Sequence, residues 1–299
     1  MSRVLVTGAA GFTGRFLAPL LAARGHEVHG VVHSLLDELP KGVHQLHVAD
    51  LADASSIGGV VSEVRPEMVV HLAAIAFVGH DDIGELYRTN IVGSRHLLEA
   101  LAAAPDRPSM ILVASSANIY GNAREGVLDE TVLPQPANDY GVSKMAMEAV
   151  ASLYSERLPI TLARPFNYTG VGQAENFLIP KIVAHARDRL PLIELGNVDV
   201  ARDFSDVRSV VEIYARLLEE PRAIGGTYNV CSGQAVTLRE VLSNVEALAD
   251  HKMELRINPA FVRANEVPTL SGSSALLESV IGPLPHIPLR DTLSWMLRA

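Results

Sequence analysis

The feature that most constrains the fold of this chain is a strand followed at once by a glycine-rich turn and a helix. The apolar run Arg3–Thr7 leads into Gly8, and Gly11 and Gly14 complete a G-x-x-G-x-x-G spacing before an amphipathic helix that reaches about Arg24. The first glycine permits a tight turn, the second lets the backbone approach a pyrophosphate, and the third lets the helix pack closely on the sheet. The spacing alone is weak evidence, but its place between a strand and a helix predicts a dinucleotide-binding unit.

Strand-like and helix-like segments alternate through the first half of the chain, and one of the longest helices is expected near Ile83–Ala104. Strands separated by helices indicate a parallel sheet covered on both faces. We therefore expect an α/β fold of the Rossmann type, a doubly wound parallel sheet. The strands expected after the first are His26–Val32, Val43–Val48, Met68–Leu72, Met110–Ala114 and Ile160–Ala163.

The regular alternation of strand-like and helix-like segments ends after Pro165, where frequent prolines divide the chain into short elements. This pattern predicts a smaller C-terminal α/β lobe that binds substrate. We expect residues 1–164 to form the dinucleotide-binding domain and residues 165–299 to form mainly the substrate lobe, with a segment of about 205–232 returning to the first domain. A ligand would bind between them, beyond the carboxyl ends of the strands.

Composition narrows the classes of partner and the cellular location. The net charge is -9 with no long run of either sign, which disfavours a nucleic-acid or acidic-membrane partner. The single cysteine, Cys231, excludes an intrachain disulfide and is expected to be a buried strand residue. The sequence opens without a signal-peptide pattern and has no apolar stretch near the roughly 20 residues that span a bilayer, so a cytoplasmic protein is expected. The histidines are scattered without a ligand spacing, so no metal site is expected.

A second motif carries the chemistry. Tyr140 and Lys144 stand four residues apart, which places both on one face of a helix. An ammonium beside a phenol is expected to lower the phenol pKa and to make proton exchange feasible near neutral pH. Ser116 follows the expected strand Met110–Ala114 and can polarise a substrate oxygen shared with Tyr140. The predicted catalytic residues are Ser116, Tyr140 and Lys144.

The end of the second strand bears on the choice of cofactor. A dinucleotide fold usually has an acid there that holds the ribose 2′-hydroxyl, and such an acid would repel a 2′-phosphate. This chain has His33 and Ser34, and the nearest acids, Asp37 and Glu38, come several residues later. NADP(H), or acceptance of both NADP(H) and NAD(H), is therefore favoured, while Arg15 fits either a cofactor contact or a solvated helix position.

These motifs together resemble the extended short-chain dehydrogenase/reductases, the NAD-dependent epimerase/dehydratase family, along essentially the whole chain. The resemblance implies that Asp50 and Leu51 border the adenine, that Ala73 and Ala74 line the cofactor, and that Asn90 supports the active-site backbone. It leaves His71 as a packing residue at a strand end. The cofactor-binding residues implied in full are Gly8, Gly11, Phe12, Thr13, Gly14, His33, Asp50, Leu51, Ala73, Ala74, Asn90, Tyr140 and Lys144.

Two places separate the branches of this family. Nucleotide-sugar dehydratases carry an acid pair just after the catalytic hydroxyl, where this chain has Ala117 and Asn118, so dehydration is disfavoured and a reductase or a 4-epimerase remains. The stretches Ala163–Asn167, Gly170–Gln173 and Ala201–Phe204 resemble bacterial GDP-4-dehydro-6-deoxy-D-mannose reductases, which make GDP-D-rhamnose. The substrate-binding residues that this resemblance implies are Ser116, Asn167, Asn176, Lys181, Arg202 and Arg263, although a surface salt bridge is an equal reading for Arg263.

Several alternatives remain open at this point. A 4-epimerase would use the same three catalytic residues with tightly bound NAD, and a dTDP-4-dehydro-L-rhamnose reductase would share the Arg-Pro-Phe-Asn stretch. Either C4 configuration of the product, rhamnose or talose, is compatible with the sequence. A non-catalytic cofactor-sensing protein is a remote alternative, because such proteins commonly lose the Tyr-Lys pair. By analogy with the family, a homodimer is expected through Ile83–Ala104 and Asp139–Leu158.

Overall fold

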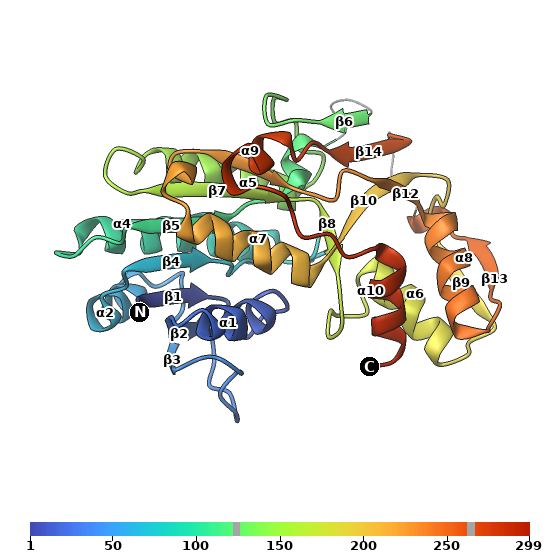
Figure 1. Cartoon of the computed structure of the whole chain (residues 1–299), viewed down its shortest axis with the longest axis horizontal. Coiled ribbons are helices and arrows are strands. Elements are labelled where there is room, and N and C mark those ends of the chain that lie inside the picture. The colour runs from blue at the N-terminus through green and yellow to red at the C-terminus, as the bar shows by residue number, and fades with distance from the viewer. Residues whose placement is uncertain (122–125, 262–266) are drawn as a thin grey trace.

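A seven-stranded sheet is the centre of the fold (Figure 1). The computed structural model describes residues 1–121, 126–261 and 267–299. The strand order is β11-β7-β5-β4-β1-β2-β3, and all of the neighbouring strands are parallel. The strands are β1 (Arg3–Thr7), β2 (Glu27–Val32), β3 (Gln45–Val48), β4 (Met68–His71), β5 (Met110–Ala114), β7 (Ile160–Pro165) and β11 (Thr227–Val230). The first six expected strands are therefore present, with ends that differ by a few residues at most.

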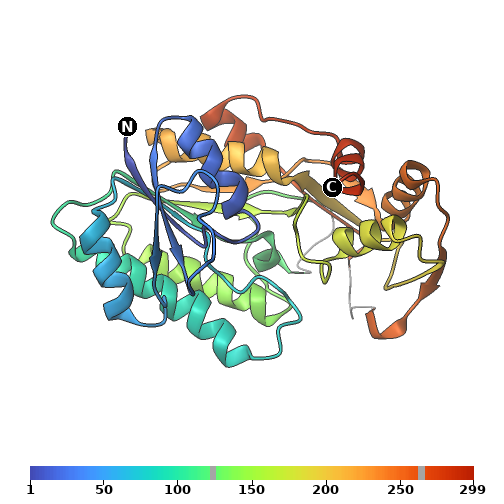
Figure 2. The same cartoon turned by 90° about the horizontal axis from the view of Figure 1, so that it is seen from below.

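Helices cover both faces of this sheet, which confirms the doubly wound α/β fold (Figure 2). On one face α1 (Gly14–Ala23) and α7 (Val207–Glu219) enclose an apolar core, joined at its edge by α9 (Ala275–Ile281). On the other face lie α2 (Ala54–Val64), α4 (Ser94–Ala103) and α5 (Asp139–Ser152). None of the helices within the described ranges is long and apolar enough to cross a membrane.

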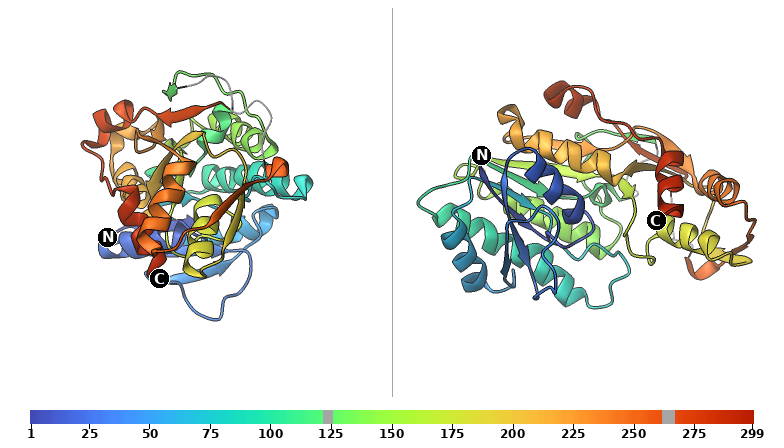
Figure 3. Two further views of the ribbon diagram at one scale, coloured as in Figure 1. Left: turned by 90° about the vertical axis from the view of Figure 1, so that its right-hand side faces the viewer. Right: turned by 60° about the horizontal axis from the view of Figure 1, so that its bottom comes forward.

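A second group of elements lies beyond the carboxyl ends of the large sheet (Figure 1). Its five-stranded sheet has the path β12-β10-β14-β6, and β8 pairs with β10. These strands are β6 (Gly126–Leu128), β8 (Asn167–Thr169), β10 (Ala201–Asp206), β12 (Ala235–Thr237) and β14 (Thr269–Gly272). A separate apolar core joins α6 (Leu178–Arg187), α8 (Leu238–Ala249), α10 (Leu289–Leu297) and the strand pair β9 (Leu192–Leu195) and β13 (Glu254–Ile257). The N-terminus lies at the large sheet and the C-terminus at this group (Figure 3).

The helix expected over Ile83–Ala104 is interrupted. The chain forms α3 (Ile83–Tyr87), then a π-helical segment η1 (Arg88–Gly93), and then α4. A π-helical turn is wider than an α-helical one and is commonly found at functional sites. Here it contains Asn90, whose side chain is fully buried and bonded to residues outside the helix. The long expected helix was thus wrong in its middle, because tertiary contacts of Asn90 override the local periodicity.

Candidate active site

The glycine turn after β1 can hold a pyrophosphate. Gly8 has a positive φ of 72°, and a Cβ there would lie 2.9 Å from the Ala73 nitrogen. A Cβ on Gly14 would collide with the Gly8 carbonyl oxygen. The Thr13 hydroxyl at the start of α1 does not cap the helix. The Arg15 and Phe16 N–H groups donate to the Gly11 and Thr13 carbonyls, so the glycine turn itself is the part of the backbone that can face an anion.

A buried hydrogen-bond chain fixes the segment that follows β4. The Ala73 N–H donates to Thr7 Oγ1 (3.2 Å), and Thr7 Oγ1 pairs with His71 Nδ1 (2.7 Å). His71 Nε2 pairs with Ser94 Oγ (2.8 Å), which donates to the Asn90 carbonyl (2.7 Å). Every group is satisfied when Thr7 donates to Nδ1 and the imidazole carries its proton on Nε2. Burial lowers the pKa of His71 to about 3, so this histidine is neutral.

The Asn90 amide joins this hydrogen-bond network to α5, the helix that carries Tyr140 and Lys144. Its Oδ1 accepts from the Ile75 N–H (2.8 Å), and its Nδ2 donates to the Ile75 carbonyl (3.0 Å) and to Ser143 Oγ (2.9 Å). Ser143 in turn donates to the Tyr140 carbonyl (2.8 Å). One side chain in the π-helical segment therefore positions both the loop after β4 and the first turn of α5. His71 belongs to the same network, so it is more than the packing residue that the sequence indicated.

Tyr140 and Lys144 lie on one buried face of α5, and Ser116 stands at the end of β5. The Asn138 side chain caps α5 by accepting from the Gly141 N–H (2.8 Å). Burial raises the pKa of the Tyr140 phenol well above its usual range, and a hydrogen bond from Ser116 opposes this shift. The expectation that Lys144 lowers the phenol pKa below its usual value was wrong, because desolvation of the phenolate outweighs the other effects.

The Ser116 hydroxyl is oriented by the residue two positions on. It accepts from the Asn118 backbone N–H (3.1 Å) and from Asn118 Nδ2 (3.2 Å). Since a hydroxyl has two acceptor positions and one proton, both acceptor positions are occupied and the proton is directed elsewhere. The Ser116 hydroxyl lies close enough to the Tyr140 phenol to oppose the rise of the phenol pKa. The two hydroxyls are therefore neighbours at the end of β5.

The Lys144 ammonium is held at the carboxyl end of β5. Its Nζ donates to the Ala114 carbonyl (2.7 Å), and burial lowers its pKa to about 8 while Glu148 acts in the opposite direction. Glu148 forms a buried two-bond ion pair with Arg164 on β7 (2.9 and 2.7 Å), and Arg164 also donates to Tyr120 Oη (2.9 Å). Sequence reasoning missed Glu148, although its spacing of four residues from Lys144 placed it on the same helix face.

The residues expected to contact the adenosine half of the cofactor lie near the ends of β2 and β3. His33 is exposed and follows β2 directly, with no carboxylate beside it in sequence. Asp50 is exposed and accepts from the Ala52 N–H (2.8 Å), whereas Leu51 is buried. Ala73 and Ala74 are half-buried in the loop after β4.

The residues expected to hold the nucleotide sugar are distributed over three elements. Asn167 on β8 donates to the Asp203 carbonyl (3.1 Å), and Asn176 is exposed before α6. Lys181 donates to the Glu194 carbonyl (2.9 Å) and stands over the Phe261 ring. Arg202 donates to backbone carbonyls, among them that of Val267 (3.0 Å). Arg263 lies outside the described residues.

Sequence reasoning also missed a contact between the glycine turn and the smaller sheet. Tyr168 on β8 places its hydroxyl 2.7 Å from Thr13 Oγ1, and its ring stacks on Phe12 at 5.9 Å between centroids. The partners of the hydrogen bond are 155 residues apart in the chain, so no local pattern could indicate it.

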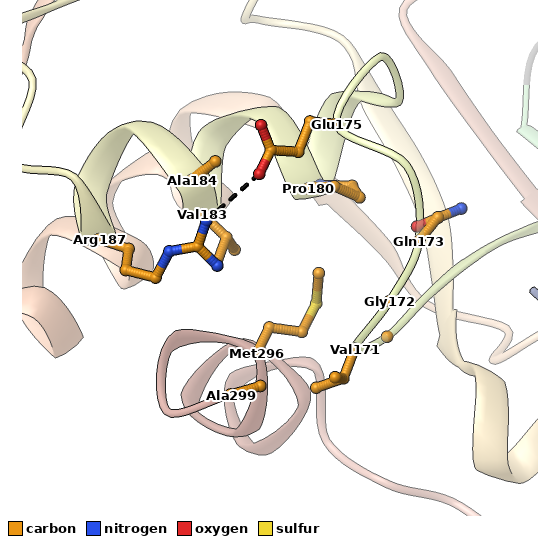
Figure 4. Close-up of a pocket in the computed structure, with 11 residues that line it drawn as sticks. Val171, Gly172, Gln173, Glu175, Pro180, Val183, Ala184, Arg187, Met296 and Ala299 are labelled. Atoms are coloured by element: carbon orange, nitrogen blue, oxygen red, sulfur yellow. Dashed lines mark hydrogen bonds and ion pairs between the residues drawn. The ribbon is translucent and has the colours of Figure 1, made fainter.

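A cavity of about 240 Å³ lies between α6, the segment after β8 and α10 (Figure 4). Its lining is mostly apolar, including Val171, Val183 and Met296, and the Arg187–Glu175 ion pair (3.2 Å) crosses its rim. It contains none of the predicted catalytic, cofactor-binding or substrate-binding residues. The candidate catalytic residues lie outside this cavity, after β5 and on α5.

Comparison with known proteins finds similar enzymes. The chain is 33% identical to GDP-6-deoxy-D-talose 4-dehydrogenase of Aggregatibacter actinomycetemcomitans, over 94% of this chain and 91% of that protein. It is 34% identical to GDP-6-deoxy-D-mannose reductase of Pseudomonas aeruginosa, over 99% of this chain and 96% of that protein.

Two solved structures extend the similarity to the fold. A Burkholderia cenocepacia protein described as a candidate epimerase is 49% identical, with a TM-score of 0.93 over 99% of this chain and 97% of that one. The protein RMD of Pseudomonas aeruginosa, complexed with NADPH, is 31% identical, with a TM-score of 0.84 over 100% and 97%. The model of the family described as GDP-mannose 4,6 dehydratase matches residues 5–296. The chain therefore belongs to the GDP-mannose 4,6-dehydratase family.

Proposed function

We propose that this protein is an NAD(P)H-dependent oxidoreductase that reduces the 4-keto group of a nucleotide-activated 6-deoxyhexose, with GDP-4-dehydro-6-deoxy-D-mannose as substrate and GDP-D-rhamnose as product. The observation that carries the proposal is that the Ser116 hydroxyl acts on the Tyr140 phenol, one helical turn from the buried Lys144 ammonium, in a chain whose glycine turn has room for a dinucleotide. The proposal is supported by the similarity to the two enzymes named above, a GDP-6-deoxy-D-talose 4-dehydrogenase and a GDP-6-deoxy-D-mannose reductase.

The residues divide the reaction between them. When bound, the reduced nicotinamide supplies the hydride for C4. Tyr140 donates its proton to the alkoxide that develops on O4, and Ser116 donates a hydrogen bond to the same oxygen. Lys144 stabilises the phenolate that remains until solvent reprotonates it. Burial raises the pKa of the phenol, so Tyr140 keeps its proton until the more basic alkoxide forms on O4.

Reduction is preferred over dehydration despite the name of the family. Dehydration across C5 and C6 needs an acid beside the catalytic hydroxyl, and this chain has Ala117 and Asn118 there. The Asn118 amide and backbone N–H are both engaged in orienting Ser116. A group that donates two hydrogen bonds to the catalytic hydroxyl cannot replace a carboxylic acid as a proton donor to the sugar.

The residues present fit a nicotinamide dinucleotide. Gly8 and Gly14 leave room that a Cβ would fill, and the start of α1 is not capped by a side chain. His33 follows β2 where a carboxylate would repel a 2′-phosphate, so we propose NADPH as the preferred reductant, with NADH accepted. The complex of the Pseudomonas aeruginosa protein RMD with NADPH supports this choice.

The remaining assignments follow the family. Asn167, Asn176, Lys181, Arg202 and Arg263 are proposed to hold the nucleotide diphosphate and its sugar, since arginine can bind two phosphate oxygens at once. We propose the division into a cofactor domain of residues 1–164 and a mainly substrate-binding lobe of residues 165–299. We also propose that the protein forms a homodimer through η1, α4 and α5.

The test is cofactor oxidation with freshly prepared GDP-4-dehydro-6-deoxy-D-mannose. Wild-type protein should oxidise NADPH in proportion to the sugar consumed. Tyr140→Phe should reduce kcat roughly a hundredfold to ten-thousandfold, the usual contribution of a general acid. Tyr154→Phe removes a phenolic hydroxyl near the far end of α5 and should retain activity. Absence of oxidation by the wild type would exclude the GDP-keto sugar as substrate.

A 4-epimerase is the second candidate, favoured by the 49% identity to the Burkholderia cenocepacia protein. An epimerase keeps its cofactor bound and returns the hydride to the sugar. Denaturing the purified protein would release stoichiometric NAD from an epimerase and little cofactor from the reductase that we propose. The same keto-sugar assay with a dTDP substrate distinguishes the dTDP-4-dehydro-L-rhamnose reductase alternative.

A further inference from the structure

A tyrosine of the smaller sheet contacts the turn that we propose to hold the cofactor phosphates. Tyr168 lies on β8, which pairs in parallel with β10 so that Tyr168 stands opposite Ser205. Its carbonyl accepts from Gln173 Nε2 (3.2 Å), and its ring stacks on Phe12 with an interplanar angle of 16°. The backbone of Tyr168 is therefore fixed by its strand and by Gln173, and its side chain packs against the glycine turn.

The Tyr168 hydroxyl limits which hydrogen bonds the Thr13 hydroxyl can form. Thr13 Oγ1 lies 2.7 Å from Tyr168 Oη, and Thr13 makes no capping bond to α1, although threonine is a common capping residue. Burial raises the pKa of Tyr168, so the phenol remains protonated and can donate. If the phenol donates, Thr13 keeps its own proton for an acceptor on its other side.

We propose that Tyr168 is a positioning residue for the cofactor: by donating to Thr13 Oγ1 it directs the Thr13 proton toward a phosphate oxygen at the start of α1. The inference rests on the proposed nicotinamide-cofactor function and adds a residue from the smaller sheet to the cofactor site. Thr13 supplies a neutral donor at the N-terminal end of α1, where the helix dipole favours an anion.

The physical advantage is preorganisation. Without the phenol, the Thr13 hydroxyl can rotate and bond to its own backbone, as threonine commonly does in helical segments. Binding of a phosphate would then have to reverse that rotation, and the ordering cost would appear as weaker affinity. With Tyr168 in place the hydroxyl is oriented before the cofactor arrives.

The test is NADPH affinity, measured by the change in nicotinamide fluorescence on binding to the full-length protein. Tyr168→Phe keeps the ring that stacks on Phe12 and removes only the hydroxyl. We expect its Kd for NADPH to rise about 3- to 10-fold, the range for loss of one hydrogen bond. At saturating NADPH, kcat should change less than twofold, and the melting temperature without cofactor should change by about 2 °C or less.

A double-mutant cycle tests whether Tyr168 acts through Thr13. Thr13→Val should weaken NADPH binding at least as much as Tyr168→Phe does, and the double variant should bind like Thr13→Val alone. Tyr154→Phe is the control: it removes a phenolic hydroxyl just after the C-terminal end of α5, and this variant should bind NADPH as the wild type does. These results together would support the positioning role.

Three results would overturn the inference. A Kd for Tyr168→Phe within a factor of two of the wild type would remove its basis, and an additive double variant would show that Tyr168 does not act through Thr13. A large loss of melting temperature or kcat in Tyr168→Phe would indicate a general structural role. Failure of the wild type to bind either NADPH or NADH is distinguishable from these, because it would refute the proposed function itself.

Discussion

At the scale of single residues, the proposed acid and its neighbouring ammonium have pKa values that burial moves in opposite directions. Tyr140 is shifted to remain protonated, and Lys144 is shifted downward to about 8. The loss of the Lys144 charge is therefore the first titration that the reaction would experience as pH rises above neutrality. The opposite shifts of the two groups leave a range around neutral pH in which the phenol is protonated and the ammonium is largely charged.

This predicts the alkaline limb of the pH profile. Because the charged form of Lys144 stabilises the phenolate and its pKa is lowered to about 8, kcat/KM of the free enzyme should decline as pH rises through about 8, with loss of one proton. Lys144→Arg, whose charge does not titrate in this range, should lack that limb even though its activity is lower. An unchanged limb in Lys144→Arg would assign the titration to another group.

The orientation of Ser116 gives a second prediction at this scale. Asn118→Ala removes the Nδ2 donor to Ser116 Oγ and keeps the backbone donor. We expect kcat to fall several-fold, by an amount that reflects one lost hydrogen bond, and Ser116→Ala to fall further. Steady-state kinetics at saturating cofactor measure both variants. If Asn118→Ala retained full kcat, the side chain would not be needed to orient the hydroxyl.

Residue patterns were informative where the interaction is local and failed where it is not. The spacing of Tyr140 and Lys144 predicted a shared helix face, and both are buried on α5. The predicted direction of the Tyr140 pKa shift was wrong. Burial depends on what packs around the helix, and a five-residue motif does not reveal it. Tyr168 was missed for the same reason, since its partner Thr13 is distant in sequence.

At the scale of elements, β1, β4, η1 and α5 are joined by the network through Thr7, His71, Ser94 and Asn90. The alternation of strands and helices was readable because it follows from apolar periodicity. The π-helical segment was not, because its cause is a pair of contacts from Asn90 to Ile75 and Ser143. The apolar periodicity of a helix does not reveal an interruption that is caused by contacts with distant residues.

The neutral state of His71 predicts acid sensitivity. Its pKa is lowered from 6.5 to about 3, so the unfolded chain binds more protons between these values and stability falls as pH falls through that window. The contribution is about 1.4 kcal/mol for each pH unit below about 6. Urea unfolding at several pH values should show a shallower slope for His71→Asn, which is also less stable at pH 7. His44→Asn, at an exposed histidine, should keep the wild-type slope, and equal slopes in all three proteins would contradict the prediction.

The buried pair of Glu148 and Arg164 connects α5 to β7 and lies behind Lys144. Glu148→Gln leaves the Arg164 charge without its ion-pair partner and should lower the free energy of unfolding by about 3–5 kcal/mol. It should also move the alkaline limb of kcat/KM to lower pH, because Glu148 raises the pKa of Lys144. Glu99→Gln, at an exposed glutamate of α4, is the matched control. A Glu148→Gln enzyme with the wild-type limb would show that the pair does not influence Lys144.

At the scale of the whole molecule, the large sheet and the smaller group of strands have separate apolar cores, and β8 and β10 lead from one to the other. The proposed dimer would cover apolar side chains that the single chain leaves exposed, among them Val92 and Leu153. Light scattering should give twice the 32.1 kDa of the chain, and Leu153→Arg should shift the population toward the monomer. A wild-type mass of one chain would contradict the dimer.

The central claim is that hydride leaves the cofactor and remains on C4 of the released sugar. The most direct measurement supplies NADPH deuterated at the transferred position of the nicotinamide and determines the mass of the GDP-sugar product. Our account predicts one deuterium at C4 of the product and one oxidised cofactor released for each sugar reduced. A product without deuterium, or one formed with no net oxidation of NADPH, would contradict the reductase and favour the epimerase.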